Sequence, residues 1–543
     1  MRTEARAHRG STRSRARSLA VIEERTSAVG HDGIRELIGP KSEAAGIRPR
    51  ARSLALTRLL RFHAKDNLMT DLTDLAYLPA TEALHRFRDR SLSPVELMTA
   101  VIARAEAVEP KINALAERTF EEALAAARVA EARYGGKGEA PRALEGLAVA
   151  TKEEQPIAGR RSTDGSLAFR EEIAEQTHPV IERVQAAGGI VHARTTTPEF
   201  SCAGYTQSRL WGVTRNPWNL EFSPGGSSGG AGAALAAGAA TLATGSDIGG
   251  SIRIPASYTG TVGYKPPYGR VPAMTPFNLD TYCHDGPMAR TVGDCALLEN
   301  VIAGPHPLDA VSLRPALVLP ERFEGVEGLR VALSVTLGDW PVDPEVEANT
   351  RAVAKALHEA GAVVEEVEVP IMRADVTRAA MIHFGSIFGP YVASVAAEHS
   401  DQLTAYALDF AQRAAEAARE PGSFLQGLEI EAAVQTTLGS LLDRYDVLLC
   451  PTTAIPALRA DDDYLSTKVV INGVELDFYL ESAMTTAFNI ASRCPVLSVP
   501  SGFASTGVPT GVQLVGRTYD DATVFRAAAA IESIRPWNSV PVL

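Results

Sequence analysis

The sequence has 543 residues, of which 45% are hydrophobic and 22% charged, and its formal net charge is −12. This composition is that of an ordinary globular protein with a full-sized core. Residues 1–68 hold 15 Lys or Arg against 7 Asp or Glu, a net of +8, so the remaining chain carries −20. An acidic body lacks the basic face that nucleic-acid binding requires, so we expect no nucleic-acid partner.

The first 68 residues differ from the rest of the chain in pattern as well as in charge. They are rich in Arg, Ala and Ser, and Arg and Glu interrupt their apolar stretches, so they contain no signal-peptide core. We expect residues 1–68 to be a disordered extension and residues 69–543 to form one large domain. No run of residues is apolar enough to span a membrane, so we expect no membrane partner.

The cysteines show the spacing of neither a disulfide framework nor a zinc site. Their number is odd, and no two are spaced as CxxC. The histidines form no metal-binding pattern either. We therefore expect reduced thiols in a cytoplasmic protein, with no metal and no cofactor. The five cysteines are Cys202, Cys283, Cys295, Cys450 and Cys494.

Helix and strand patterns alternate along the chain from residue 75 onward. Ser93, followed by Pro94 and Glu96, predicts a helix start in which the serine is the N-cap and the glutamate closes a capping box. The elements predicted after it are a helix at 120–134, a strand at 147–150 that leads to Lys152, a helix at 180–187, strands at 190–193 and 329–335, a helix at 350–360 and a strand at 363–367. This alternation favours an α/β fold with a parallel or mixed sheet.

The most informative segment spans residues 223–269. Four glycines flank Ser227 and Ser228 just before a predicted helix at 231–240, whose free N–H groups and positive dipole end face the serines. A second cluster ends 24 residues later in Gly249-Gly250-Ser251. A tight turn there would expose the serine hydroxyl and let successive N–H groups converge on one point, as an oxyanion hole requires.

Two other motifs fit parts of this segment less well. Residues 225–229 match G-x-S-x-G, the nucleophile elbow of α/β-hydrolases, but residues 216–224 are not the apolar strand that an elbow needs. A glycine-rich loop before a helix can also bind phosphate. The segment lacks G-x-x-x-x-G-K-[ST], and residues 230–232 have neither a preceding strand nor a third glycine, so nucleotide binding is not expected.

Residues 225–266 resemble the amidase signature, a long Gly- and Ser-rich pattern with GGSSGG, GxDxGGSIRxPA and GxKP elements. Lys152 follows a short strand, as the catalytic lysine of the amidase signature family does. Further similar elements are residues 286–292 (GPMAR-TV), residues 446–453 (D-x-L-x-x-P-T), Asn489, and residues 511–516 (G-x-Q-x-x-G). The resemblance spans residues 69–534.

The resemblance implies a triad in which Ser251 is the nucleophile, Ser227 the bridging serine and Lys152 the base. It also implies a fold, a mixed and twisted sheet of about eleven strands between layers of helices. The N–H groups expected to form the oxyanion hole are those of Ile248, Gly249, Gly250 and Ser251.

Four residues of the signature would support this site: Gly226, Ser228, Asp247 and Arg253. Gly226 would precede Ser227 through a cis peptide bond. We expect Asp247 and Arg253 to pair and to brace the nucleophile loop. Serine needs a base to become a nucleophile, and a lysine is a base only when it is neutral, a state that burial favours. With only serine hydroxyls expected around Lys152, we expect activity to rise towards alkaline pH.

The expected function is therefore that of an amidase that hydrolyses a C–N bond of a small or aryl amide, with carbamates and esters as further candidate substrates. The expected partner is a small-molecule substrate, and a homodimer is a candidate assembly. Departures from the family pattern at Glu153, Tyr258-Thr259 and residues 493–495 avoid the predicted triad. We expect residues 305–445 to build the substrate pocket.

Two alternatives stay open. One is the A-type subunit of glutamyl-tRNA(Gln) amidotransferase, which supplies ammonia and works with a partner. Such subunits usually carry Gln where this chain has Ile254. The other is a non-catalytic binding protein with a decayed site, against which the presence of all three triad residues argues.

Overall fold

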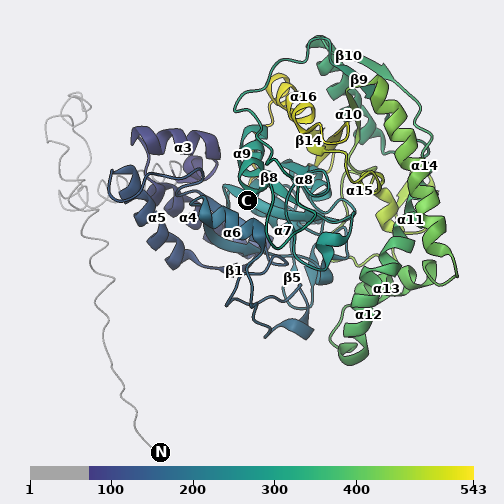
Figure 1. Ribbon diagram of the computed structural model, residues 1–543, viewed down its shortest axis with the longest axis horizontal. Helices are drawn as coiled ribbons and strands as arrows, with labels where there is room; N and C mark the ends of the chain where they lie inside the picture. The colour runs from purple at the N-terminus through teal and green to yellow at the C-terminus, as the bar shows by residue number, and fades with distance from the viewer. Residues whose placement is uncertain (1–71) are drawn as a thin grey trace, which may run out of the picture. The chain divides into compact units, whose positions relative to one another are not determined.

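Eleven strands form one continuous mixed sheet at the centre of the protein (Figure 1). The computed structural model describes residues 72–543. The predicted disorder of residues 1–68 and the predicted domain start at residue 69 lie outside the described residues. Within them, the predicted α/β fold with a mixed, eleven-stranded sheet between helices is confirmed.

The sheet combines parallel and antiparallel pairs. Its strands are β1 (Leu115–Arg118), β2 (Ala148–Lys152), β3 (Ile190–Thr195), β6 (Leu242–Asp247), β7 (Val262–Lys265), β8 (His284–Ala289), β9 (Arg330–Leu333), β10 (Val363–Glu366), β11 (Val447–Pro451), β14 (Val496–Phe503) and β15 (Pro509–Gly516). Their spatial order is β1-β3-β2-β6-β8-β7-β14-β15-β11-β9-β10. The pairs of β2 with β3 and β6, and of β9 with β10 and β11, are parallel, and the other pairs are antiparallel.

Two short hairpins lie outside the sheet. They consist of β4 (Gln207–Ser208) with β5 (Gly212–Val213), and of β12 (Val470–Ile471) with β13 (Val474–Glu475).

Helices surround the sheet. They are α3 (Ala80–Asp89), α4 (Pro94–Ile112), α5 (Phe120–Tyr134), α6 (Pro179–Ala186), α7 (Gly229–Ala236), α8 (Arg253–Thr259), α9 (Val292–Ile302), α10 (Pro344–Glu359), α11 (Arg373–Ser386), α12 (Phe388–His399), α13 (Ala405–Ala417), α14 (Ser423–Arg444), α15 (Ala487–Ile490) and α16 (Asp521–Ile534). The helices α11, α12, α13 and α14 pack on one another and appear in green in Figure 1.

Strand β15 shows that helices cover both faces of the sheet. Successive side chains of a strand point to opposite faces. A Cβ atom added at Gly511 would meet Ser257 of α8, whereas one added at Gly516 would meet Val524 of α16. Because these two glycines differ by an odd number of positions, α8 and α16 lie on opposite faces.

The predicted helix start at Ser93 is present in atomic detail. The Ser93 hydroxyl accepts the N–H of Glu96 at 3.1 Å, and the Glu96 carboxylate accepts the N–H of Ser93 at 2.9 Å. Helix α10 begins at Pro344 and not at residue 350, because Asp343 caps it by accepting the N–H of Glu345 at 2.8 Å.

The helix predicted at residues 231–240 is shorter than expected at its C-terminus. Helix α7 covers Gly229–Ala236, and Gly238 follows with a φ of 75°. This left-handed conformation is one that glycine adopts freely, and it commonly ends a helix.

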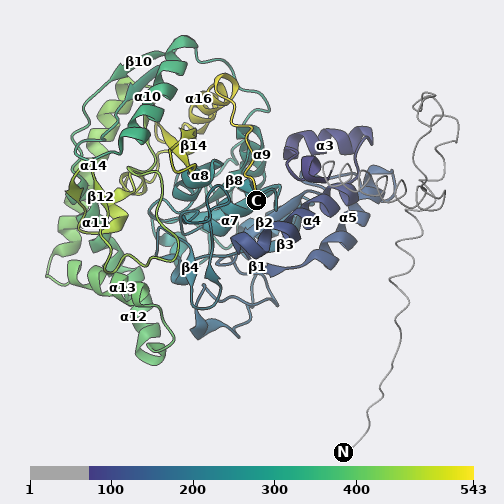
Figure 2. The same ribbon diagram turned by 180° about the vertical axis from the view of Figure 1, so that it is seen from behind.

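The pairing of β2 with β6 brings together two segments that the sequence separates. The two strands are parallel, with Val149 opposite Leu242 and Ala150 opposite Ala243. Their carboxyl ends therefore meet at one edge, where β2 ends with Lys152 and β6 with Asp247. Figure 2 shows β2 beside β3, close to α7.

Within residues 72–543, no single helix has both the length and the hydropathy of a membrane span. Helices α11 and α12 have that length and hydropathy only when they are taken together, and the chain bends by 51° between them.

Candidate active site

Lys152 lies at the end of β2 with a fully buried side chain. Its Nζ atom donates to the Ser227 hydroxyl at 2.7 Å and to the Ser246 hydroxyl at 2.8 Å. It also lies 2.7 Å from Oε2 of Glu154. The lysine therefore has a carboxylate neighbour, and the expectation that only serine hydroxyls surround it is wrong.

Glu154 is the functional neighbour that the sequence analysis missed. Glu153 comes directly after Lys152 in the sequence, but its carboxylate accepts the N–H and the hydroxyl of Thr163 at 2.7 and 2.6 Å. Strand β2 ends at Lys152, and the chain then turns, with the N–H of Gln155 donating to the carbonyl of Lys152 at 3.0 Å, which brings the Glu154 side chain back beside the lysine. Burial raises the pKa of Glu154. The Lys152 ammonium and two serine hydroxyls together lower it by more than burial raises it, so the net pKa lies below its ordinary value.

Ser227 lies in the turn that leads into α7. The peptide bond between Gly226 and Ser227 is cis, as expected. The chain packs closely here, because a Cβ atom at Gly226 would lie 2.5 Å from two backbone carbonyl oxygens of the segment opposite. Ser228 is the N-cap residue of α7, and its hydroxyl donates to the carbonyl of Ser246 at 3.3 Å. Both predicted supporting residues thus lie directly at the bridging serine.

Ser251 follows β6 in a turn that depends on glycine. Gly250 has a φ of 127°, and a Cβ atom there would lie 2.1 Å from Oγ1 of Thr485. The turn places Ser251 on the wall of the same cavity as Ser227, and the Ser251 carbonyl accepts the N–H of Ser228 at 3.1 Å. Within the described residues the Ser251 hydroxyl has no hydrogen-bond partner, which leaves it available to a substrate.

The predicted oxyanion hole has three free donors and not four. In the described part of the chain, the N–H groups of Ile248, Gly249 and Ser251 have no protein acceptor. The N–H of Gly250 instead donates to Oδ1 of Asp247 at 2.8 Å. Ile248, Gly249 and Ser251 all line the cavity, so three unpaired N–H groups remain there to stabilise an oxyanion.

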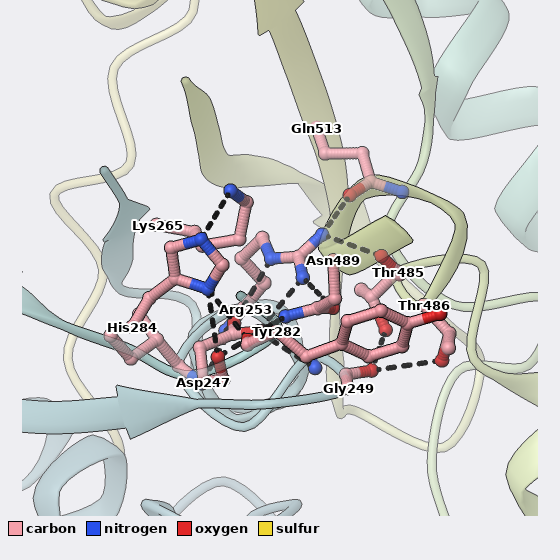
Figure 3. A network of polar contacts seen from close by, with 12 residues as sticks. Asp247, Gly249, Arg253, Lys265, Tyr282, His284, Thr485, Thr486, Asn489 and Gln513 are labelled. Atoms are coloured by element: carbon pink, nitrogen blue, oxygen red, sulfur yellow. Dashed lines mark hydrogen bonds and ion pairs between the residues drawn. The ribbon is translucent and has the colours of Figure 1, made fainter. Parts of the chain in front are cut away.

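Behind the nucleophile loop, Asp247 and Arg253 form a fully buried ion pair, as predicted (Figure 3). Two N–H···O contacts of 2.8 and 3.0 Å make it bidentate. The remaining guanidinium N–H groups donate to Asn489 at 2.8 Å, and to Gln513 and the Thr485 carbonyl at 3.0 Å each. Burial raises the pKa of Asp247, but Arg253 outweighs it, so the net pKa lies well below its ordinary value.

Two threonines hold the same loop from a distant part of the chain. The hydroxyls of Thr485 and Thr486 donate to the carbonyl of Gly249 at 2.5 and 3.1 Å (Figure 3). Thr485 is 236 positions from Gly249, and no motif marks it, so the sequence analysis did not single it out.

His284 and Lys265 complete this network on its far side (Figure 3). The Nδ1 atom of His284 lies 3.2 Å from the carbonyl of Asp247, and its Nε2 lies 3.4 Å from Nζ of Lys265. Burial, followed by the Lys265 charge, lowers the pKa of His284 to about 3. Burial, followed by the charge of Arg253, lowers the pKa of Lys265 to about 7.

Ser227 and Ser251 line a cavity of about 340 Å³. Several Phe, Tyr and Trp side chains line it, and α11 and α12 supply part of the wall, so the expectation that residues 305–445 build the pocket holds only in part. Segments outside that range contribute as well, among them residues 154–164, 200–204 and 478–486. None of the described lining residues is Lys or Arg, whereas five are acidic: Glu154, Asp164, Asp247, Asp285 and Glu481.

Among the acidic residues of the cavity wall, Asp164 is the one whose negative charge its neighbours stabilise least. Its Oδ2 accepts the hydroxyl of Tyr391 at 3.0 Å, and it makes no ion pair within residues 72–543. Burial, and then the charges of Glu153 and Glu154, raise the pKa of Asp164 to about 7.

No group of three or more His, Cys, Asp or Glu side chains gathers as a metal site among the described residues.

Comparison with known proteins agrees with this geometry. Residues 96–525 match the Amidase family. The chain is 32% identical to the A-type subunit of the glutamyl-tRNA(Gln) amidotransferase of Carboxydothermus hydrogenoformans, covering 84% of this chain and 97% of the relative. It is 33% identical to an acylamidase of Rhodococcus erythropolis, covering 86% and 97%. The crystal structure of a bacterial aryl acylamidase superposes with a TM-score of 0.79 at 30% identity, covering 85% and 97%. The chain belongs to the amidase signature family.

Proposed function

We propose that this protein is an amidase that hydrolyses the C–N bond of a small or aryl amide through an acyl-enzyme on Ser251. The observation that carries the proposal is the 2.7 Å contact between Lys152 Nζ and Ser227 Oγ, with both serines on the wall of one cavity. A decayed binding protein would have no reason to keep a buried lysine on a serine hydroxyl, because burying a charge-bearing group is costly.

The proposed reaction moves one proton along the triad. Neutral Lys152 takes the proton of Ser227, and Ser227 takes the proton of Ser251 as the Ser251 oxygen forms a bond to the amide carbon. The free N–H groups at residues 248, 249 and 251 stabilise the negative charge on the former carbonyl oxygen. The C–N bond then breaks, the proton returns along the same path to the leaving amine, and water later hydrolyses the acyl ester.

The wall of the cavity favours an amide over the side chain of free glutamine. Glutamine carries an α-carboxylate, and none of the described lining residues is a Lys or Arg that could pair with it. A carboxylate that is buried without a cation of its own is strongly disfavoured. An apolar or aryl acyl group instead matches the phenylalanine-rich wall. These features favour an amidase over an amidotransferase subunit.

We also propose that the protein acts in the cytoplasm. Its five cysteines are free thiols, four of them buried, and no disulfide joins them. Reduced cysteines of this kind are typical of a reducing compartment.

A fluorophosphonate probe tests the proposed nucleophile. We expect it to label Ser251, as located by peptide mass spectrometry, and Ser251→Ala to abolish the labelling. Ser440→Ala removes an exposed serine hydroxyl from α14 and serves as the control. Labelling at Ser227 or at a cysteine would contradict the assignment.

A substrate panel tests the reaction class. We expect turnover of aryl amides in a panel that also contains fatty amides, carbamates, aryl esters and glutamine. Release of ammonia from glutamine without turnover of any other amide would favour the amidotransferase alternative.

A further inference from the structure

The Nζ atom of Lys152 has three oxygen neighbours. They are Ser227 Oγ at 2.7 Å, Ser246 Oγ at 2.8 Å and Glu154 Oε2 at 2.7 Å. A charged ammonium has three protons, and these three oxygens can accept all of them. A neutral amine has two protons and one lone pair, so one of the three contacts must reverse when the lysine becomes a base.

The hydrogen-bonding abilities of the three neighbours decide which contact reverses. The Glu154 carboxylate can only accept a proton from the lysine. The Ser246 hydroxyl donates to Oε2 of the same carboxylate at 3.1 Å, so its oxygen also accepts from Lys152. The Ser227 hydroxyl alone is free to donate, which directs the lysine lone pair at the proton that the triad must move.

We propose that Glu154 is a positioning residue that, together with Ser246, points the lone pair of Lys152 at Ser227 and stabilises the ammonium that forms when this lysine accepts a proton. The inference rests on the proposed function of the Ser251, Ser227 and Lys152 triad. Glu154 acts through the lysine, and its own carboxylate neither gains nor loses a proton in the reaction.

The carboxylate has a second effect besides orientation. A negative charge 2.7 Å from Nζ stabilises the ammonium form of the lysine relative to the neutral amine. The same charge stabilises the ammonium that forms when Lys152 takes the proton of Ser227, which makes the lysine a stronger base. Glu154 thus lowers the activity at low pH and raises the rate at high pH.

Glu154 is held in place for this role. Its Oε2 also accepts the hydroxyl of Ser201, and the side chain is 32% exposed towards the cavity that it lines. Three donors on one oxygen fix the carboxylate, so it can fix the lysine in turn.

Other charged groups near the pair are engaged elsewhere. In β3, the Arg194 guanidinium donates to the carbonyls of Glu153 and Gln155, and it lies 3.6 Å from the carboxylate of Glu117. In β8, Asp285 accepts from Gln155 and lies 3.4 Å from His178. On the neighbouring elements, the Glu153 carboxylate accepts a hydrogen bond from Thr163, and the Asp247 carboxylate pairs with Arg253. The Glu199 carboxylate accepts hydrogen bonds from Ser166 and Thr404.

Two further titratable groups sense the charge of Glu154. Burial and the charges of Glu153 and Glu154 raise the pKa of Asp164, and burial, Asp280 and Glu154 raise the pKa of the Cys283 thiol. Asp164 changes charge near neutral pH, so it needs a variant of its own in the test.

The test is the pH dependence of fluorophosphonate labelling at Ser251, which requires no knowledge of the substrate. We expect the labelling rate of the wild type to rise with pH to a plateau. Glu154→Gln keeps the shape and an acceptor oxygen but removes the charge. We expect it to move the midpoint of the rise down by about 1–3 pH units and to lower the plateau rate.

Two further variants separate charge from orientation. Glu154→Leu removes the acceptor as well, and we expect its plateau rate to fall by about 10²-fold or more. Asp164→Asn removes a charge from the same cavity without a contact to Lys152, and we expect a clearly smaller midpoint shift than that of Glu154→Gln. Melting temperatures establish that each variant is folded.

The outcomes distinguish this inference from the proposed function. A folded Glu154→Gln protein with an unchanged midpoint would overturn the role of Glu154 while labelling of wild-type Ser251 upheld the triad. An equal shift in Asp164→Asn would also overturn it, because the effect would then be one of general charge. Absence of wild-type labelling at Ser251 would contradict the proposed function itself.

Discussion

The two sides of the nucleophile loop, residues 247–253, differ in how completely their polar groups are hydrogen-bonded. On the side shown in Figure 3, the buried pair of Asp247 and Arg253 is saturated with hydrogen bonds: Arg253 donates to Gln513 and Asn489, and Asp247 accepts from Asn489 and from backbone N–H groups. On the cavity side, the hydroxyl of Ser251 and three backbone N–H groups have no partner in the described structure. Unsatisfied groups are costly and mobile on their own, so the saturated side is what keeps the reactive side in place.

This comparison predicts that the two sides fail differently. Changes on the cavity side should remove activity and leave stability nearly unchanged. Changes on the saturated side should lower stability first, because they leave a buried polar group without its partner.

The largest expected effect on the cavity side comes from Lys152→Arg. Arginine keeps its proton at any accessible pH, so it supplies charge but no base. We expect a loss in kcat/KM of about 10²- to 10⁴-fold, equal to that of Lys152→Ala, and thermal unfolding establishes that each variant is folded. Near-wild-type turnover of the arginine variant would show that the lysine acts by charge alone.

On the saturated side, Arg253→Met leaves the buried carboxylate of Asp247 without its cation. Removing one partner of a buried pair typically costs about 3–5 kcal/mol. We expect this loss in the free energy of unfolding measured with denaturant. The control is Arg351→Met, which breaks the exposed contact with Glu366 and should cost about 1 kcal/mol or less. Equal losses of unfolding free energy in the two variants would contradict the expected difference between the two sides of the loop.

Lys265 gives the saturated side a pH dependence. Its pKa is about 7 in the folded protein, against an ordinary value of 10.5. Between these values the unfolded chain binds a proton that the folded chain does not, so this group favours unfolding most below pH 7, and folding stability rises with pH above 7.

The slope from Lys265 is up to about 1.4 kcal/mol per pH unit. Lys265→Met should lack this part of the rise, so the difference in stability between wild type and variant should change from pH 7 to pH 9. Lys355→Met, at an exposed position on α10, is the control and should show no such change. A constant difference for Lys265→Met would be evidence against the low pKa.

The smallest expected effect compares two adjacent glycines. Gly250→Ala meets Thr485 in a conformation that alanine disfavours, and we expect it to cost about 1 kcal/mol or more. Gly249→Ala meets only Thr486 and Phe384 at 3.7 and 3.9 Å, so its stability should stay close to that of the wild type. Thermal unfolding of both variants measures the contrast, and the opposite ranking would show that the turn is built differently.

Local patterns were enough to predict much of this molecule. The capping box at Ser93, the helix over residues 120–134 and the strand leading to Lys152 depend on neighbouring residues, and the structure has all three. The sheet of eleven strands came from the family resemblance, because strand order depends on long-range pairing that no local pattern records.

The parts of the site that escaped prediction depend on contacts between distant segments. Thr485 and Thr486 reach the nucleophile loop from a distant part of the chain. The N–H of Gly250 was expected in the oxyanion hole, but the competition from Asp247 is visible only once the turn is folded. Glu154 meets Lys152 through a tight turn directly after β2, and no pattern in the sequence indicates that turn.

The absence of any Lys or Arg among the described residues of the cavity wall has a consequence for turnover. Hydrolysis of a neutral amide ends with a carboxylate and an amine. The carboxylate forms beside acidic side chains whose neighbouring cations, Lys152 and Arg253 among them, are already paired with them, so no free cation retains it. The released amine, once protonated, is attracted by the same side chains. Product inhibition should therefore come from the amine, and the slow step of product release should be its dissociation.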